Sequence, residues 1–169
     1  MTAAFVISHR FDAPRDLVWA VYTQPEHLAQ WLGPPGSTMP QHTMDFQVGG
    51  FFHYCMRMPN GAELWGKWLF QEIDAPHKLV LIQHFSDPEG RLTLHPMAPT
   101  WPRQTLATST LEADGQETLL TLQWLPHAST PEQMATFQTN HATMNMGWSH
   151  NFGVLDRYLA QLQSKPTPA

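Results

Sequence analysis

Residues 130–162, TPEQMATFQTNHATMNMGWSHNFGVLDRYLAQL, decide the fold that this sequence predicts. Thr130 can cap a helix, Pro131 suits its first turn, and Gln133 stands three residues after the cap, as in a capping box. The residues that follow recur at steps of three and four and form one stripe of a helix: Met134, Phe137, His141, Met144, Trp148, Phe152, Leu155, Leu159 and Leu162. We therefore predict a single amphipathic helix of about ten turns or slightly fewer, at ~3.6 residues per turn.

The chain before this helix consists mostly of short runs rich in β-branched and aromatic residues, which are typical of strands. Asn60 and Gly61 indicate a hairpin, because this pair accepts the positive φ angles of a tight turn. Residues 91–102 carry three prolines and are predicted to be mainly loop. The predicted strands are Phe5–Phe11, Thr43–Val48, Phe51–Met58, Leu64–Ile73, Lys78–Phe85, Gln104–Glu112 and Thr118–Leu125.

Two short helices are predicted after the first strand. Asp12 can cap the first helix, and the apolar side of that helix is formed by Leu17, Val18, Val21 and Tyr22. The second helix begins near Thr23 or Gln24, and the run Gly-Pro-Pro-Gly at residues 33–36 ends it.

This order of elements predicts an α+β domain in which a curved antiparallel sheet wraps around the long C-terminal helix. An antiparallel sheet with one polar face needs cover on its other face. A single helix covers a strongly curved sheet only partly, so a cavity forms wherever side chains do not fill the gap. We expect one domain over residues 1–163 and a disordered tail over residues 164–169.

Charge and composition restrict the classes of partner and the compartment. The net charge is −5 and no basic run occurs, so nucleic-acid binding is not expected. Cys55 is the only cysteine, which rules out a disulfide within the chain and indicates a reducing compartment. The N-terminus has no signal-peptide pattern and no apolar stretch is long enough to span a bilayer. We expect a cytoplasmic protein without membrane insertion.

Several stretches, taken in order, resemble the SRPBCC superfamily, also called START-like or helix-grip, and specifically its heat-shock-protein-90 ATPase activator (AHSA)-like branch. The resemblance runs from Phe5 to Leu162. The stretches that carry it are Phe11–Trp19, Pro25–Trp31, Val48–Phe52, Trp65–Trp68, Glu72–Val80, and Gly147-Trp148 with Leu155 and Leu159.

The resemblance implies a helix-grip fold with a hydrophobic cavity between the sheet and the helix. Members of this superfamily include co-chaperone domains, lipid carriers, polyketide cyclases, an antibiotic-sequestering protein and single-domain bacterial proteins. The chain is similar to the single-domain bacterial type. The partners that the resemblance implies are a small hydrophobic molecule and, as for the co-chaperones, a chaperone ATPase.

Eleven aromatic, pliable or polar residues on the predicted elements are candidates for lining this cavity. They are Trp31, Phe52, Tyr54, Trp68, His84, Phe137, His141, Met144, Asn145, Trp148 and Phe152. Large flat side chains and methionines suit a planar or aliphatic ligand, but the same residues can equally fill a core. Alternation places Phe52 and Tyr54 on one face of their strand and His53 and Cys55 on the other, and either face could be the concave one.

His141 is the polar member of the apolar helix stripe. It could point into the cavity to orient a ligand or to move a proton. Alternatively, it is a buried histidine that is hydrogen-bonded to a strand or to Asn145.

The sequence assigns no catalytic residue, metal site or cofactor. Among the ten histidines no pair has the spacing of a helical zinc motif. Gly49-Gly50 is not followed by a helix, so it does not form a phosphate-binding loop. Cys55 is interpreted as a small buried thiol, and Glu72 as a structural residue.

Three functions are compatible with these observations. The first is a non-enzymatic binding protein for a small hydrophobic molecule. The second is a cyclase- or aromatase-like enzyme that uses His141 with Tyr54, Arg57 or His84 as acid and base. The third is an interaction module for a chaperone ATPase, which requires an exposed apolar patch on the outer sheet or on residues 91–102. A homodimer, formed through that loop or a sheet edge, is also compatible with the sequence.

Overall fold

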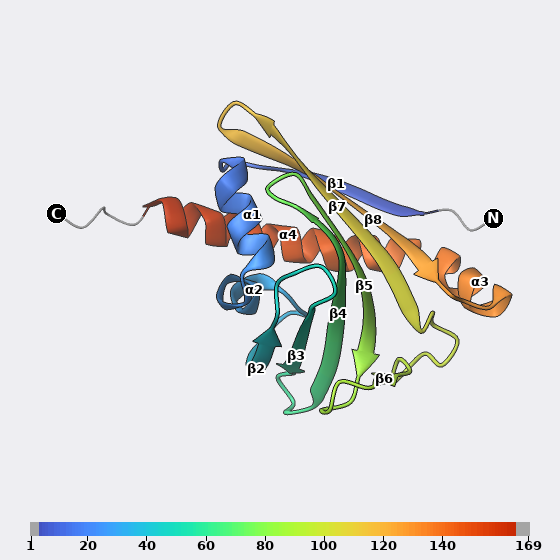
Figure 1. Ribbon diagram of the computed structural model, residues 1–169. Coiled ribbons are helices and arrows are strands. Elements are labelled where there is room, and N and C mark those ends of the chain that lie inside the picture. The colour runs from blue at the N-terminus through green and yellow to red at the C-terminus, as the bar shows by residue number, and fades with distance from the viewer. Residues whose placement is uncertain (1–3, 165–169) are drawn as a thin grey trace.

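The computed structural model describes residues 4–164. One antiparallel sheet has the strand order β1-β8-β7-β5-β4-β3-β2, and the short β6 pairs with β5 (Figure 1). The strands are β1 (Phe5–Phe11), β2 (Thr38–Met44), β3 (Phe51–Arg57), β4 (Glu63–Asp74), β5 (Lys78–Ser86), β6 (Leu92–Thr93), β7 (Gln104–Asp114) and β8 (Glu117–His127).

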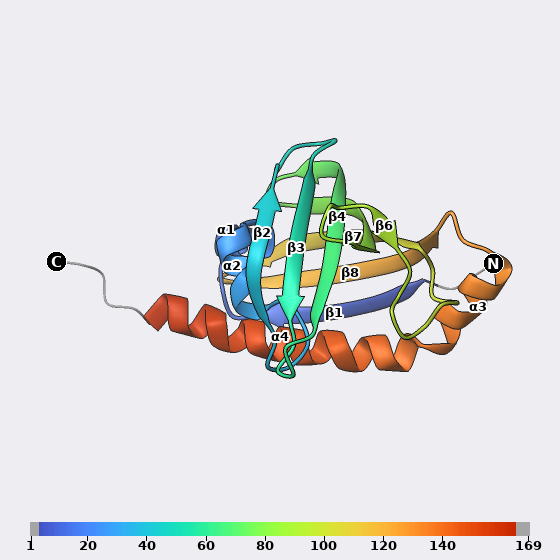
Figure 2. The same cartoon turned by 90° about the horizontal axis from the view of Figure 1, so that it is seen from below.

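Four helices accompany this sheet in the described part of the chain: α1 (Arg15–Thr23), α2 (Pro25–Trp31), α3 (Pro131–Thr139) and α4 (His141–Ser164). Figure 2 shows α4 running the length of the molecule beneath the strongly twisted sheet, with α1 and α2 at one end and α3 at the other. The α+β helix-grip fold, with two short helices after the first strand, is therefore confirmed. None of these helices has both the length and the apolar character needed to cross a membrane.

The long helix predicted from residue 130 is in fact two helices joined at Asn140. The predicted capping box at Thr130 and Gln133 is present. Asn140 ends α3, because its side-chain Nδ2 donates to the carbonyl of Thr136 at 2.7 Å and so competes with the helical backbone pattern. Its own carbonyl accepts the first bond of α4, from the N–H of Met144 at 3.0 Å. The prediction of one continuous rod was wrong at this joint.

The second strand lies earlier in the chain than the predicted range of residues 43–48. β2 spans Thr38–Met44 and contains Pro40, which an edge strand tolerates because one of its sides has no ladder partner. The following residues turn back instead, with the carbonyl of Asp45 accepting from the N–H groups of Gln47 and Phe51.

Smaller differences occur at the other ends of elements. The predicted cap Asp12 makes no capping bond, since α1 begins after Pro14 without a side-chain cap. Within residues 91–102, predicted to be mainly loop, two residues form β6. Ser164, expected in the tail, is the last residue of α4, and residues 165–169 lie outside the described residues.

The core lies between the sheet and the helices, and alternation along the strands produces it. In β7 every second residue from Thr105 to Leu111 is buried, as expected for a sheet covered on one face. Phe11 of β1 and Phe152 of α4 are 0% and 1% exposed, and their rings meet edge to face at 5.6 Å. Burial of one such side chain stabilises the fold by about 1.5–3 kcal/mol.

We call the side of the sheet that faces α4 the inner face and the opposite side the outer face. Phe5 of β1 contacts the ring of the first residue of α4, so it marks the inner face. Phe5 lies opposite Trp124 of β8, and Trp124 lies opposite Ala107 of β7. Ala107 pairs with Leu81 of β5, and Leu81 pairs with Phe70 of β4. Because paired side chains project from the same face, this row identifies the inner face across the sheet.

Candidate functional site

Four candidate residues on α3 and α4 form one aromatic group with residues of β1 and β8: Phe137, His141, Trp148 and Phe152. The ring of His141 meets Phe5 at 5.8 Å and Phe137 at 5.2 Å, both edge to face. The ring of Trp148 contacts the ring of Trp124, with 5.6 Å between centroids, and the ring of Phe152, with 5.4 Å between centroids. Residues far apart in the sequence thus meet under the sheet, as the helical stripe predicted. Met144, on the same stripe, is also buried.

A second aromatic group lies on the inner face of β3 and β4. Phe52 stacks on Tyr54 at 4.8 Å and meets Trp68 at 5.2 Å. Gly66 lies directly opposite Tyr54, and a Cβ atom at Gly66 would lie 2.5 Å from the tyrosine hydroxyl. The glycine therefore makes room for the phenol ring. Burial raises the pKa of Tyr54 to about 12, so its hydroxyl stays neutral at physiological pH.

Trp31 and Asn145 do not join either group. Trp31 of α2 stacks on Tyr22 at 5.6 Å, and its Nε1 donates to the carbonyl of Val21 at 2.8 Å. Its polar atom is thus used within the helical pair α1 and α2. Asn145 is exposed on α4, where its Oδ1 lies 3.5 Å from the hydroxyl of Ser149.

His84 lies on the outer face, away from α4. His84 is paired with Lys67 of β4, and Lys67 is paired with His53 of β3, so these three side chains share one face. Tyr54 is paired with Gly66 and therefore projects from the opposite, inner face. The Nδ1–H of His84 donates to the carbonyl of Phe85 at 2.8 Å. Burial, together with the charges of Lys67 and His53, lowers the pKa of His84. The placement of His84 among the inner candidates was therefore wrong, because the cross-strand register reverses its face.

The acid–base set that a cyclase would need is also divided by the sheet. Arg57 pairs with Glu63 at 3.4 Å, and the same carboxylate accepts from the thiol of Cys55 at 3.1 Å. Cys55 is on the outer face of β3 and fully buried. Burial and Glu63 raise the pKa of Cys55 to about 11, which keeps the thiol protonated and inert. Arg57 and His84 are thus separated by the sheet from Tyr54 and His141.

A comparison with known families decides which family this architecture represents. The sequence pattern of the family described as activator of Hsp90 ATPase homolog 1-like protein matches residues 12–160. This chain belongs to that AHSA1-like family. The match confirms the resemblance to the AHSA-like branch that the sequence motifs indicated. No curated protein sequence matches the chain.

Solved structures share the fold of this AHSA1-like chain. A protein from Arthrobacter aurescens is 31% identical, with a TM-score of 0.74 over 94% of this chain and 86% of that one. A Mycobacterium smegmatis protein has a TM-score of 0.75 and 22% identity over 99% and 94% of the two chains. The AHSA1 protein of Silicibacter pomeroyi has a TM-score of 0.72 and 19% identity, over 94% and 99%.

His141 of this AHSA1-like chain is half-buried, and it is one of three described residues, with Arg15 and Asn151, that have a buried polar atom without a hydrogen-bond partner. Its Nε2 is buried and has no hydrogen-bond partner among the described residues. Neither a strand nor Asn145 supplies a bond to this atom, so the interpretation as a satisfied core histidine does not hold for Nε2. A buried polar nitrogen inside an aromatic group is suited to contact a polar atom of a bound molecule.

The inner aromatic groups are closed at one end by residues 91–102, which we call the lid segment. His95 meets Phe85 of β5 at 4.8 Å and Trp101 at 6.2 Å. Trp101 then meets Phe137 of α3 at 5.7 Å. The lid segment thus links the sheet to α3 by a row of rings. The sequence predicted this segment mainly as loop and did not show these ring contacts, because they join residues far apart in the sequence.

Among residues 4–164, surface pockets occur that the sequence did not predict. One, of about 440 Å³, opens on the outer side of β2 and β3 and is lined by Pro40, Gln41, His42, Thr43, His53, Trp65 and Pro88. A second, of about 430 Å³, lies beside α1 and is lined by Asp16, Trp19, Ala20, Thr23, Gln24, Phe46, Ala75 and Pro76. Neither is lined by a residue of α3 or α4, so both are distinct from the inner aromatic groups.

Proposed function

We propose that this AHSA1-like chain binds a small, largely hydrophobic molecule between the inner face and α4. The observation that carries the proposal is the buried Nε2 of His141, which has no partner among the described residues and lies in an aromatic surround. A buried polar atom without a partner costs about 1–3 kcal/mol. A ligand that supplies the missing hydrogen bond recovers that free energy on binding.

The surround defines the chemistry of the ligand. The rings of Phe5 and Phe137 flank His141, and Trp148 and Phe152 continue the aromatic group along α4. Such rings favour an aromatic or aliphatic body. His141 is the polar contact at this position, so the ligand carries one hydrogen-bonding group on an otherwise apolar framework.

Entry of the ligand requires the lid segment to move. Phe137 is fully buried and its ring is covered by Trp101. Trp101 and His95 are held by ring contacts rather than by a strand ladder, and Met97 between them is 88% exposed. Loops of this kind open at low free-energy cost. We expect the lid segment to open and reclose around the bound molecule.

Titration with the neutral fluorescent probe N-phenyl-1-naphthylamine tests this function. The probe has an apolar body and one N–H group, which matches the inferred ligand. His141→Phe removes the ring nitrogen and keeps a flat ring, so it should weaken binding about fivefold or more, the value of one hydrogen bond. His150→Phe, at an exposed position of the same helix, should leave binding unchanged. Equal affinity of the two variants would refute the role of His141.

A second function, docking to a chaperone ATPase, is favoured by the exposed apolar side chains of the lid segment. Leu92, Leu94 and Met97 are 40%, 43% and 88% exposed, and the family is described by Hsp90 ATPase activation. The triple variant Leu92→Ser, Leu94→Ser and Met97→Ser should lose stimulation of a purified Hsp90 ATPase. Absence of stimulation by the unmodified chain would exclude this function.

A further inference from the structure

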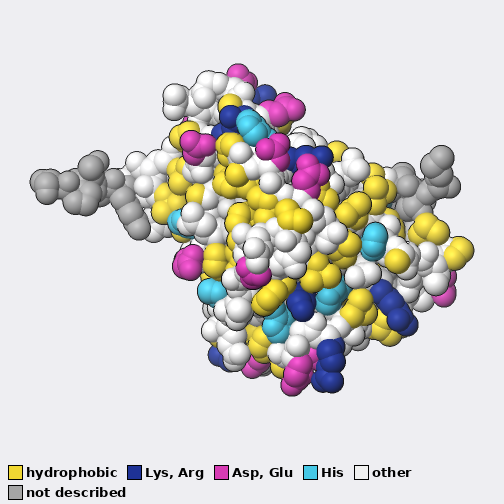
Figure 3. Space-filling model, in the orientation of Figure 1, with side chains coloured by type: hydrophobic (Ala, Val, Ile, Leu, Met, Phe, Trp, Pro, Cys, Tyr) yellow, Lys and Arg dark blue, Asp and Glu magenta, His cyan; other side chains and the backbone are white. Residues whose placement is uncertain are grey.

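The pocket on the outer side of β2 and β3 is built from elements that meet only in the folded chain. Thr43 of β2 lies opposite His53 of β3, and Pro88 of the β5–β6 turn lines the same pocket. Its volume of about 440 Å³ is in the range of small-molecule sites. Figure 3 shows histidine, basic and acidic side chains together over this part of the outer face.

Two flat rings form one wall of this outer pocket. His53 stacks on Trp65 with 4.9 Å between ring centroids and 30° between planes. The Nε2 of His53 lies 3.1 Å from both the carbonyl of Asp87 and the hydroxyl of Ser86. Since a carbonyl can only accept, Nε2 carries the proton and Ser86 is not activated as a nucleophile. The turn therefore holds the ring of His53 in place through its Nε2–H.

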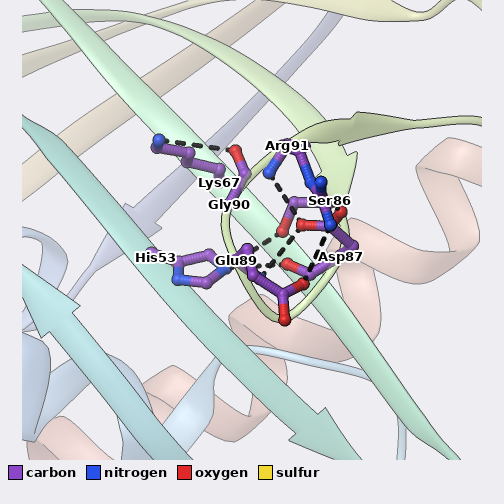
Figure 4. Close-up of polar contacts among 7 residues, drawn as sticks. All are labelled: His53, Lys67, Ser86, Asp87, Glu89, Gly90 and Arg91. Atoms are coloured by element: carbon purple, nitrogen blue, oxygen red, sulfur yellow. Dashed lines mark hydrogen bonds and ion pairs between the residues drawn. The ribbon is translucent and has the colours of Figure 1, made fainter.

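The rim of the outer pocket is a pre-organised turn (Figure 4). The Oδ1 of Asp87 accepts from the N–H groups of Glu89 and Arg91 at 3.0 and 2.9 Å. Its Oδ2 accepts from the Nε of Arg91 at 2.7 Å. Pro88 is thereby fixed between two anchored residues, and the carboxylate of Asp87 is neutralised by the guanidinium.

A lysine lies beside the outer pocket. Lys67 is the cross-strand neighbour of both His53 and His84. Within residues 4–164 its ammonium makes no ion pair; it lies 3.4 Å from the carbonyl of Gly90 and over the ring of Phe51. No carboxylate lines the pocket. An anionic group therefore finds a cation that no side chain of the described residues neutralises.

We propose that the outer pocket binds a small planar aromatic carboxylate. Its ring packs against Trp65 and Pro88, and its carboxylate lies toward the hydroxyl of Thr43 and the side of the pocket nearest Lys67. Aromatic faces and proline rings favour a flat apolar body, while the hydroxyl of Thr43 and the nearby ammonium of Lys67 favour a negative charge over a neutral polar group. This site is separate from the one between the inner face and α4.

Benzoate is the probe, with benzyl alcohol as its neutral counterpart. Binding is followed by the indole N–H resonance of Trp65, which is identified by its loss in Trp65→Phe. Benzoate should shift this resonance at concentrations about three- to fivefold lower than benzyl alcohol requires. Lys67→Met should weaken benzoate binding about three- to fivefold, as expected for a partly exposed ion pair. The matched Lys78→Met, at the far end of β5, should leave it unchanged.

A second variant, Thr43→Val, tests the site if Lys67→Met does not fold. Thr43 is exposed on the edge strand β2, and its replacement by valine should also weaken benzoate binding. His141→Phe should bind benzoate normally, so failure of the inner site does not affect this result. Equal shifts from benzyl alcohol, shifts from a neutral sugar but not from benzoate, or no shift at all would each overturn the proposal.

Discussion

Replacing His141 by phenylalanine should make the ligand-free protein more stable, although it should weaken ligand binding. The unpartnered, buried Nε2 of His141 costs about 1–3 kcal/mol. The edge-to-face contacts with Phe5 and Phe137, at 5.8 and 5.2 Å, are of a kind that a phenyl ring also makes. The larger ring costs part of the gain through tighter packing, which leaves a net stabilisation of about 1–2 kcal/mol.

Urea unfolding and a thermal melt measure this effect. At about 2–4 °C per kcal/mol for a domain of this size, the melting temperature should rise by about 2–8 °C. His150→Phe, exposed on the same helix, should change the unfolding free energy by less than about 0.5 kcal/mol. A loss of about 1 kcal/mol or more in His141→Phe would show that His141 makes a stabilising hydrogen bond. The inference of a ligand-facing nitrogen would then be refuted.

Three further results are expected. Gly66→Ala should destabilise the fold by about 1–3 kcal/mol in urea, because the new Cβ would lie 2.5 Å from the hydroxyl of Tyr54; a neutral effect would contradict the close packing. Burial lowers the pKa of His95. The neutral ring therefore stabilises the closed lid segment when the pH is above about 6.5, the ordinary histidine pKa, and this stabilisation is lost as the pH falls below that value. Hydrogen exchange in residues 91–102, corrected for its intrinsic pH dependence, should therefore be faster at about pH 5.5 than at about pH 7.5, and equal protection would count against this coupling. Cys55, with its pKa raised to about 11, should react with iodoacetamide near neutral pH only after unfolding, and rapid labelling of the folded chain would disprove its burial.

Local patterns were sufficient for much of the fold. The Thr130 and Gln133 capping box and the stripe from Phe137 to Phe152 give the position and the buried face of the C-terminal helices. The break at Asn140 was missed because it depends on one side chain that bonds to a carbonyl one turn earlier. The spacing of apolar residues alone does not show that a side chain competes with a backbone N–H for a helix carbonyl.

The faces of the strands required register, which is a long-range property. Alternation separates Tyr54 from His53 within β3, but the inner face is determined only when the strands pair. In β4 a bulge between Phe70 and Glu72 shifts the alternation, so that Ile73 continues the inner row. For the same reason the sequence could not show that His84 lies on the outer face, beside Lys67.

The outer pocket had no signal in the sequence, because its residues come from three strands and a turn. His53 and Trp65 stack only once β3 and β4 are in register, and Pro88 reaches them only through the turn that Asp87 anchors. The same holds for the unpartnered nitrogen of His141, which depends on how Phe5 packs against α4. In both cases the residue type was visible in the sequence, but its surroundings were not.

The central claim, that a small apolar molecule binds between the inner face and α4, is tested most directly by intermolecular nuclear Overhauser effects. The measurement uses N-phenyl-1-naphthylamine bound to the protein with its aromatic side chains assigned. We predict cross-peaks from the probe to the ring protons of Phe137, Trp148 and Phe152. Cross-peaks confined to outer-face residues such as Trp65 would contradict the claim.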